Sequence, residues 1–162
     1  MKTKLHEQTS WKTFIVPALI LLVILGSALA RPARSPVSGS GWADLYDGYA
    51  IGKADIAIRG VPQPQADVVV TLGTPRYSDE GVLHTTSEHI FYFGSGNSFT
   101  TEDKVIGDPT CTPGVYRLNE TLRIVSGTGI FAGAVGNLTV HGVLDMVLGE
   151  VTYDIRGSIS TP

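Results

Sequence analysis

The chain has 162 residues and carries 12 lysines and arginines against 15 aspartates and glutamates, so its formal net charge is −3 at pH 7. A chain of this length supports one domain with a single core. It has no basic cluster that could neutralise phosphates, which argues against a nucleic-acid partner. Cys111 is the only cysteine, so the chain can close no internal disulfide and build no thiolate metal site. We expect neither a cofactor nor a metal ion.

Residues 1–30 have the order of charge and hydropathy that is typical of a secretory signal peptide. Lys2, Lys4 and Lys12 precede an uncharged stretch, 13–30, that ends in Ala28-Leu29-Ala30. Cleavage after Ala30 would release a secreted or periplasmic protein. The alternative keeps 13–30 as a membrane anchor, because a spanning helix needs about 17–25 apolar residues. Both alternatives predict export, since amino-terminal lysines stay in the cytoplasm and a retained anchor would tether the domain to the outer face of the membrane.

Residues 31–41 are rich in proline, glycine and serine and show no apolar periodicity, which predicts a flexible linker. Residues 42–162 then form the folded domain. Strand patterns recur through it in the ranges 54–59, 68–72, 82–94, 99–105, 116–125, 138–148 and 151–159. The sequence Gly94-Ser95-Gly96-Asn97 predicts a hairpin turn. No stretch favours a helix.

Consecutive antiparallel strands expose two sheet edges unless the sheet closes, so these seven or eight expected strands favour a small all-β barrel. A β-sandwich remains open, because alternation does not distinguish a closed sheet from two packed ones. The segment from Gly127 to Gly136 contains four glycines and Phe131 between two strand patterns. This composition predicts a sharply bent β segment at a barrel corner.

The stretch from Leu122 to Gly136, followed by the last strand patterns, resembles allene oxide cyclases and dirigent proteins. The stretch from His89 to Asp103 is similar to the preceding hairpin of exported bacterial members of this barrel group. The resemblance implies an eight-stranded antiparallel barrel with a possible pocket, and a homo-oligomer. The cyclases use a glutamate and an asparagine near the start of the barrel, but residues 42–75 contain neither. The acidic and arginine residues of dirigent proteins have no match either, so no activity carries over.

Polar residues in the strand patterns are the candidate site residues. In an extended strand His84 and His89 lie on opposite faces, so they do not converge, and with Glu88 they are expected at solvated or rim positions. Glu120 shares a face with Leu118 and Leu122. If that face is inward, Glu120 is a buried carboxylate with a raised pKa and a candidate acid.

His141 and Asp145 are weaker candidates. They share the face opposite Leu138, Val140 and Leu144, and would matter chemically only if the polar face lined the barrel interior. The more ordinary arrangement has the apolar face inside and both residues in water.

No complete catalytic set can be named from these residues. The preferred interpretation is therefore an exported or membrane-tethered barrel, not an enzyme, that binds a small apolar ligand or a protein partner. The alternative is an isomerase, such as a cyclase, or a dirigent-like stereochemical guide that acts on a lipid-like or phenolic substrate.

Overall fold

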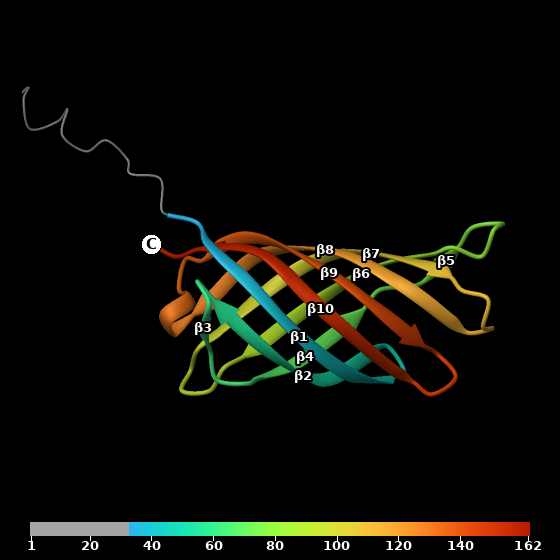
Figure 1. Ribbon diagram of the computed structural model, residues 1–162, viewed down its shortest axis with the longest axis horizontal. Helices are drawn as coiled ribbons and strands as arrows, with labels where there is room; N and C mark the ends of the chain where they lie inside the picture. The colour runs from blue at the N-terminus through green and yellow to red at the C-terminus, as the bar shows by residue number, and fades with distance from the viewer. Residues whose placement is uncertain (1–32) are drawn as a thin grey trace, which may run out of the picture. The chain divides into compact units, whose positions relative to one another are not determined.

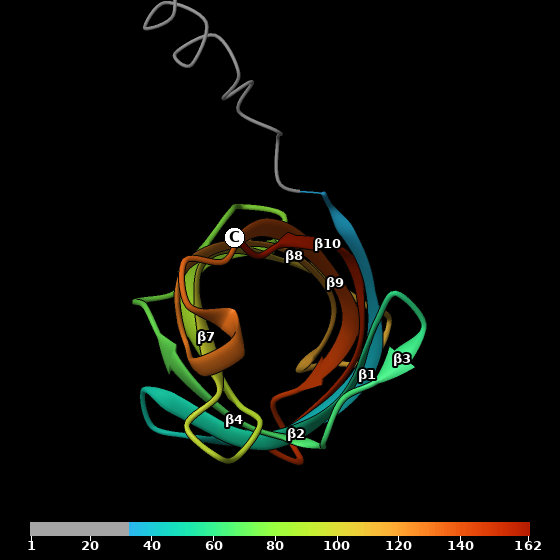
Figure 2. The same ribbon diagram turned by 90° about the vertical axis from the view of Figure 1, so that its left-hand side faces the viewer.

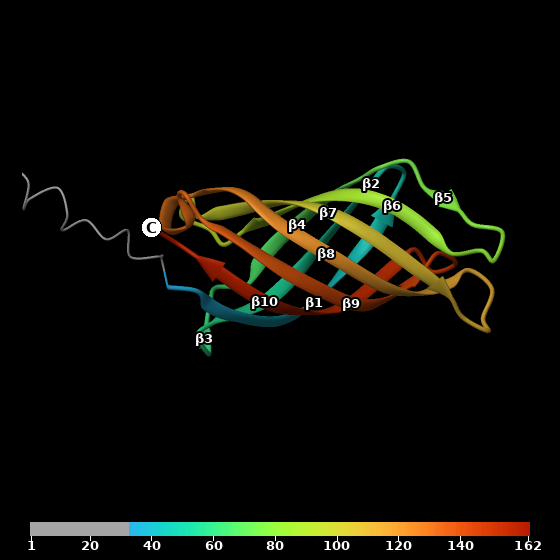
Figure 3. The same ribbon diagram turned by 90° about the horizontal axis from the view of Figure 1, so that it is seen from above.

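The computed structural model describes residues 33–162, which form a closed antiparallel barrel of eight long strands. Figures 1 and 3 show these strands wrapping obliquely around one axis. The strands are β1 (Ser35–Tyr46), β2 (Tyr49–Ile58), β4 (Ala66–Leu72), β6 (Leu83–Tyr92), β7 (Ser98–Pro109), β8 (Val115–Thr128), β9 (Val135–Asp145) and β10 (Glu150–Ser160). Two short strands, β3 (Val61–Pro62) and β5 (Arg76–Tyr77), pair with β2 and β6 at the ends of the barrel.

The sheet has the simplest closed topology. Each long strand pairs with the next one along the chain, and β10 pairs with β1 to complete the ring. Seen from one end, the strands enclose a central space (Figure 2). Closure leaves no long unpaired edge, which is the usual physical reason for a barrel. The barrel expected from the sequence is confirmed, and the sandwich alternative is wrong.

The first strand begins earlier than the sequence patterns indicate. Ser35 to Gly41 were expected in the flexible linker, but they form the first half of β1 and pair with both β2 and β10. Small residues suit this position, because Gly39 and Gly41 face the interior where a side chain would meet neighbouring strands. The expected signal peptide or anchor, residues 1–30, lies outside the described residues. Among residues 33–162, no helix is long and apolar enough to cross a membrane.

Burial alternates along every long strand, so one face of the sheet is the interior of the barrel. At one end the interior is filled by aromatic rings. Phe91 stacks on Phe99 with ring centroids 4.7 Å apart, and Phe131 lies 5.0 Å from Phe93 and 5.4 Å from Phe99. All four rings are buried. We call these four residues the aromatic plug.

Phe131 reaches the plug from outside the strands. The segment 127–136 was expected to be a bent β segment, but it contains a short 3-10 helix, Gly129–Phe131, that connects β8 to β9 across the end of the barrel. Gly127 allows this path, because a Cβ there would lie 2.2 Å from the backbone oxygen of Phe131. The glycines therefore let the chain fold over the barrel end and insert one phenylalanine.

Candidate functional site

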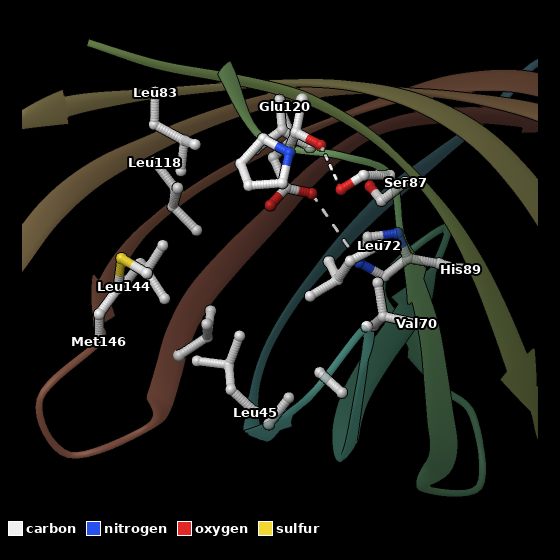
Figure 4. A pocket seen from close by; sticks show the side chains of 18 of the residues that line it. Leu45, Val70, Leu72, Leu83, Ser87, His89, Leu118, Glu120, Leu144 and Met146 are labelled. Atoms are coloured by element: carbon white, nitrogen blue, oxygen red, sulfur yellow. Dashed lines mark hydrogen bonds and ion pairs between the residues drawn. The ribbon is translucent and has the colours of Figure 1, made fainter. Parts of the chain in front are cut away.

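The half of the barrel away from the aromatic plug holds a cavity of about 590 Å³. At the end away from the plug it is lined by the β1–β2 turn, the β9–β10 turn and the segment around β5. Its walls are mainly aliphatic, as Figure 4 shows. The aliphatic side chains include Leu45, Leu72, Leu83, Leu118, Leu144 and Val151. This volume falls within the range of roughly 300–1,000 Å³ that is usual for small-molecule sites.

Three ionisable side chains meet in the interior, between the apolar walls and the aromatic plug. His89 Nδ1 lies 2.6 Å from Asp103 Oδ2, and His89 Nε2 lies 3.8 Å from Glu120 Oε2. The first distance is a short, charge-assisted hydrogen bond, whereas the second is too long for a hydrogen bond. Figure 4 shows His89 and Glu120 pointing toward one another. We call His89, Asp103 and Glu120 the acid-base cluster.

The strand alternation brings the cluster together. His89, Asp103 and Glu120 occupy inward positions on β6, β7 and β8, which are neighbours in the sheet. All three residues are buried, and the carboxylate oxygen of Asp103 that bonds His89 also lies 3.4 Å from the Ser87 hydroxyl. The His89 ring stacks on Phe91, with ring centroids 5.8 Å apart, so the plug fixes one side of the imidazole.

Tyr153 adds a fourth polar group to the cavity wall. It lies on β10 directly opposite Gly41 of β1 and Gly142 of β9. Both neighbours must be small: a Cβ on Gly41 would lie 2.5 Å from the tyrosine ring, and one on Gly142 would lie 2.9 Å from the tyrosine Cβ. Within residues 33–162, the buried Tyr153 hydroxyl and Glu120 Oε2 have no hydrogen-bond partner. Unpartnered buried polar groups are unusual and call for an explanation.

Burial and charge shift the pKa values of these groups. Burial raises the pKa of Glu120; the His89 charge opposes this and the Asp103 charge adds to it. Burial by itself would lower the pKa of His89, but the hydrogen bond to Asp103 and the charges of Glu120 and Asp103 outweigh it and raise that pKa above its ordinary value. Burial, together with the charge of Glu120, raises the pKa of Tyr153. The tyrosine therefore stays a neutral donor, while burial favours the protonated form of Glu120.

The cluster has the groups needed for proton exchange with a bound molecule. Asp103 accepts the Nδ1 hydrogen of His89 and so directs Nε2 toward Glu120. Among the described residues, no group of three or more His, Cys, Asp or Glu side chains is arranged to hold a metal ion. The side chains of the acid-base cluster can donate and accept hydrogen bonds and can transfer protons.

The structure separates the candidates that the sequence proposed. Glu120 faces the cavity and is buried, which is the condition under which the sequence made it a candidate acid. His84 and Glu88 are exposed on the outer face of β6. The expectation of a solvated or rim position for His89 is wrong, because alternation turns it inward, opposite in direction to His84.

His141 and Asp145 lie outside the cavity. His141 is exposed and bonds the Asn119 side chain at 2.8 Å on the outer surface of the sheet. Asp145 Oδ1 accepts hydrogen bonds from the backbone N–H groups of Val147 and Leu148, which stabilises the β9–β10 turn. The apolar face of these strands is the inner one, so neither side chain reaches the acid-base cluster.

Two groups were missed as candidates: Asp103, which bonds His89, and Tyr153, which lines the cavity. Asp103 sits in the alternating run Phe99, Thr101, Asp103, Val105, whose members are all buried. Asp103 alternates in phase with the apolar residues Phe99 and Val105, and this pattern could have identified it as a charged side chain that faces inward. Tyr153 gave no comparable signal, because a tyrosine on an apolar face is ordinary core.

Comparisons with known proteins add little to this geometry. A scan against protein-family models found no match, and a search of curated proteins found no relative. Among solved structures, the chain is similar to one described as the pterocarpan synthase dirigent protein GePTS1. The identity is 14% and the TM-score 0.37, over 80% of this chain and 89% of the other. At these values the likeness carries no argument, and the fold described above rests on strand pairing.

Proposed function

We propose that this barrel binds one small, mostly apolar molecule that carries a neutral polar group at one end. The observation that supports the proposal is the cavity of about 590 Å³, whose walls are aliphatic and whose buried polar atoms include two without partners. Apolar walls reward burial of a hydrocarbon skeleton, at about 25 cal/mol per Å². The Tyr153 hydroxyl and the Glu120 carboxyl supply orientation, because a bound carbonyl or hydroxyl would satisfy them.

The proposal makes the polar end of the ligand matter. A straight-chain methyl ketone should bind more tightly than the alkane of equal length, since only the ketone can accept a hydrogen bond from Tyr153. A fatty carboxylate should bind less well than the ketone, because its charge would be buried beside Glu120. Isothermal titration calorimetry with these three compounds ranks them directly.

A bulky side chain in the cavity tests where the ligand lies. Val151 is half-buried and lines the cavity, whereas Thr152, the next residue of β10, is exposed on the outer face. We expect Val151→Trp to weaken ketone binding by at least about tenfold, or about 1.4 kcal/mol, because indole fills part of the cavity. Thr152→Trp is the matched control and should leave the affinity unchanged.

The two variants also define failure. Equal affinities for Val151→Trp and the parent protein, with both folded by circular dichroism, would place the ligand elsewhere. No measurable binding of ketone, alkane or carboxylate would contradict the proposed function.

One observation favours the second candidate, an isomerase or stereochemical guide. A binding cavity needs a donor or an acceptor, but it does not need a histidine held between two buried carboxyl groups. Burying such a cluster costs free energy, and clusters of this kind are more common at sites of proton chemistry. Both the isomerase and the stereochemical guide must first bind a ligand inside the barrel, so the binding function is proposed first.

Export is part of the proposal. It is supported by the amino-terminal sequence, in which lysines precede an uncharged stretch that ends in Ala28-Leu29-Ala30.

A further inference from the structure

Three polar residues, His89, Glu120 and Tyr153, line the same cavity from β6, β8 and β10. Glu120 lies on β8 and Tyr153 on β10, with β9 between them. At that point β9 presents Gly142, which stands opposite both Leu118 and Tyr153 in the sheet. The Tyr153 side chain covers Gly142, since a Cβ on Gly142 would lie 2.9 Å from the tyrosine Cβ, and both Glu120 and Tyr153 line the cavity. A molecule in the cavity therefore lies beside both residues.

We propose that the barrel catalyses proton transfer within a bound β,γ-unsaturated ketone and converts it to the α,β-unsaturated isomer. The inference rests on the proposed function, because the ketone must first bind in the cavity. Glu120 and Tyr153 are the catalytic residues, and His89 and Asp103 are positioning residues. The reaction is an isomerisation, so it needs no oxidant, reductant or co-reactant.

Glu120 moves the proton. Its carboxylate accepts a proton from the carbon between the carbonyl group and the double bond, and the electron pair of that C–H bond forms a dienolate. The carboxylic acid that results returns the proton to the γ carbon, and the double bond comes into conjugation with the carbonyl. Atoms and charge balance, and Glu120 ends in the carboxylate form in which it began. Glu120 Oε2 faces His89 Nε2 at 3.8 Å, and because the residue lines the cavity, its other oxygen, Oε1, is the one that receives the proton.

Tyr153 stabilises the charge that forms during the first step. Its hydroxyl donates a hydrogen bond to the ketone oxygen, and this bond strengthens as the oxygen becomes a dienolate. The raised pKa of Tyr153 keeps the hydroxyl protonated, so it remains a donor throughout the neutral range. The aliphatic walls exclude water, which makes the hydrogen bond more effective than it would be in solution.

His89 and Asp103 act through Glu120. The imidazolium charge of His89, 3.8 Å from Glu120 Oε2, favours the carboxylate form that the first step requires. Asp103 holds the ring by its Nδ1 hydrogen. Groups that face His89 from the packed strands are Asp103 on β7 and Glu120 on β8, with Tyr153 on β10 interacting with Glu120.

The test uses a straight-chain β,γ-unsaturated methyl ketone with the intact protein. We expect the ultraviolet absorption of the conjugated product to grow with time. In deuterium oxide, deuterium should appear at the γ carbon of the product by NMR. Binding is measured separately by calorimetry with the saturated ketone, which cannot isomerise.

Matched variants identify the groups. Glu120→Gln should lower kcat by at least about a hundredfold, and Tyr153→Phe by about a hundredfold, while the saturated ketone still binds both. Glu88→Gln and Tyr92→Phe change the same residue types at exposed positions of β6 and should leave kcat unchanged. Asp103→Asn should lower kcat and shift the pH-rate profile, which loss of structure alone would not do.

The outcomes separate the two proposals. If the saturated ketone binds but the parent protein neither forms product nor exchanges deuterium, the catalytic proposal is wrong and the binding function stands. Full activity in folded Glu120→Gln would also overturn it. If the ketone does not bind, both the binding function and the catalytic proposal fail for this class of compound.

Discussion

At the scale of single residues, Glu120 and His89 both hold protons more tightly in the folded barrel than in the unfolded chain. The pKa of each group is raised, mainly by burial for Glu120 and by the Asp103 hydrogen bond and neighbouring charges for His89. The folded state therefore binds more protons than the unfolded state over the pH range that separates the ordinary and raised values. Stability must fall as pH rises through that range.

We therefore expect the contribution of these two groups to the free energy of unfolding to be greatest below the ordinary glutamate pKa of about 4.3 and to decline through and above the ordinary histidine pKa of about 6.5. Urea unfolding at a series of pH values measures the decline. The double variant Glu120→Gln, His89→Gln should flatten it, whereas Glu88→Gln, an exposed carboxyl on the same strand as His89, should not. If the parent protein became more stable as pH rises through this range, the raised pKa values of Glu120 and His89 could not be what controls its pH dependence.

The inner and outer faces explain what the sequence could predict about the site. Glu120 was a candidate because it shares a strand face with Leu118 and Leu122, and all three residues do lie on the inner face. His89 was assigned to the surface because it was judged with His84 and Glu88, which share the other face. The contact between His89 and Glu120 depends on the register in which β6, β7 and β8 pair. That register includes an irregularity between Thr100 and Thr101 of β7, which the sequence does not indicate.

At the scale of elements, the connection between β8 and β9 closes one end of the barrel. Phe131 is 2% exposed within the aromatic plug, whereas its neighbour Ile130 is 62% exposed. We expect Phe131→Ala to lower the free energy of unfolding by about 3–5 kcal/mol, because it removes a buried ring and leaves a void. Ile130→Ala should change it by less than about 0.5 kcal/mol. Denaturant unfolding compares them, and similar losses in both variants would mean that the plug is not part of the core.

Elements with clear alternation were predictable, and elements rich in small residues were not. The ranges of β4, β6, β7, β8, β9 and β10 largely coincide with the strand patterns, as does the turn at Gly94 to Asn97. By contrast, β1 begins with Ser35-Pro36-Val37-Ser38-Gly39, which has the composition of a linker. Its strand conformation comes from pairing on both sides when the barrel closes, and that is a tertiary effect.

At the scale of the whole molecule, the chain is expected to lose its first 30 residues on export. Mass spectrometry of the protein purified from its source tests this, because cleavage after Ala30 leaves a chain that begins at Arg31. A full-length mass together with partitioning into membranes would contradict cleavage and favour the anchor. Native spectra of the same sample report the subunit number and any retained ligand.

The pairing of Ser35 with Ile159 places the start of β1 and the end of β10 side by side at the plugged end. Figure 1 shows the carboxyl terminus there, away from the β9–β10 turn at the mouth of the cavity. A support attached at Ser35 or Pro162, whether a bilayer, a resin or a fused domain, therefore holds the barrel by its closed base. The cavity mouth then faces away from the support, and solutes reach it directly from the bulk medium.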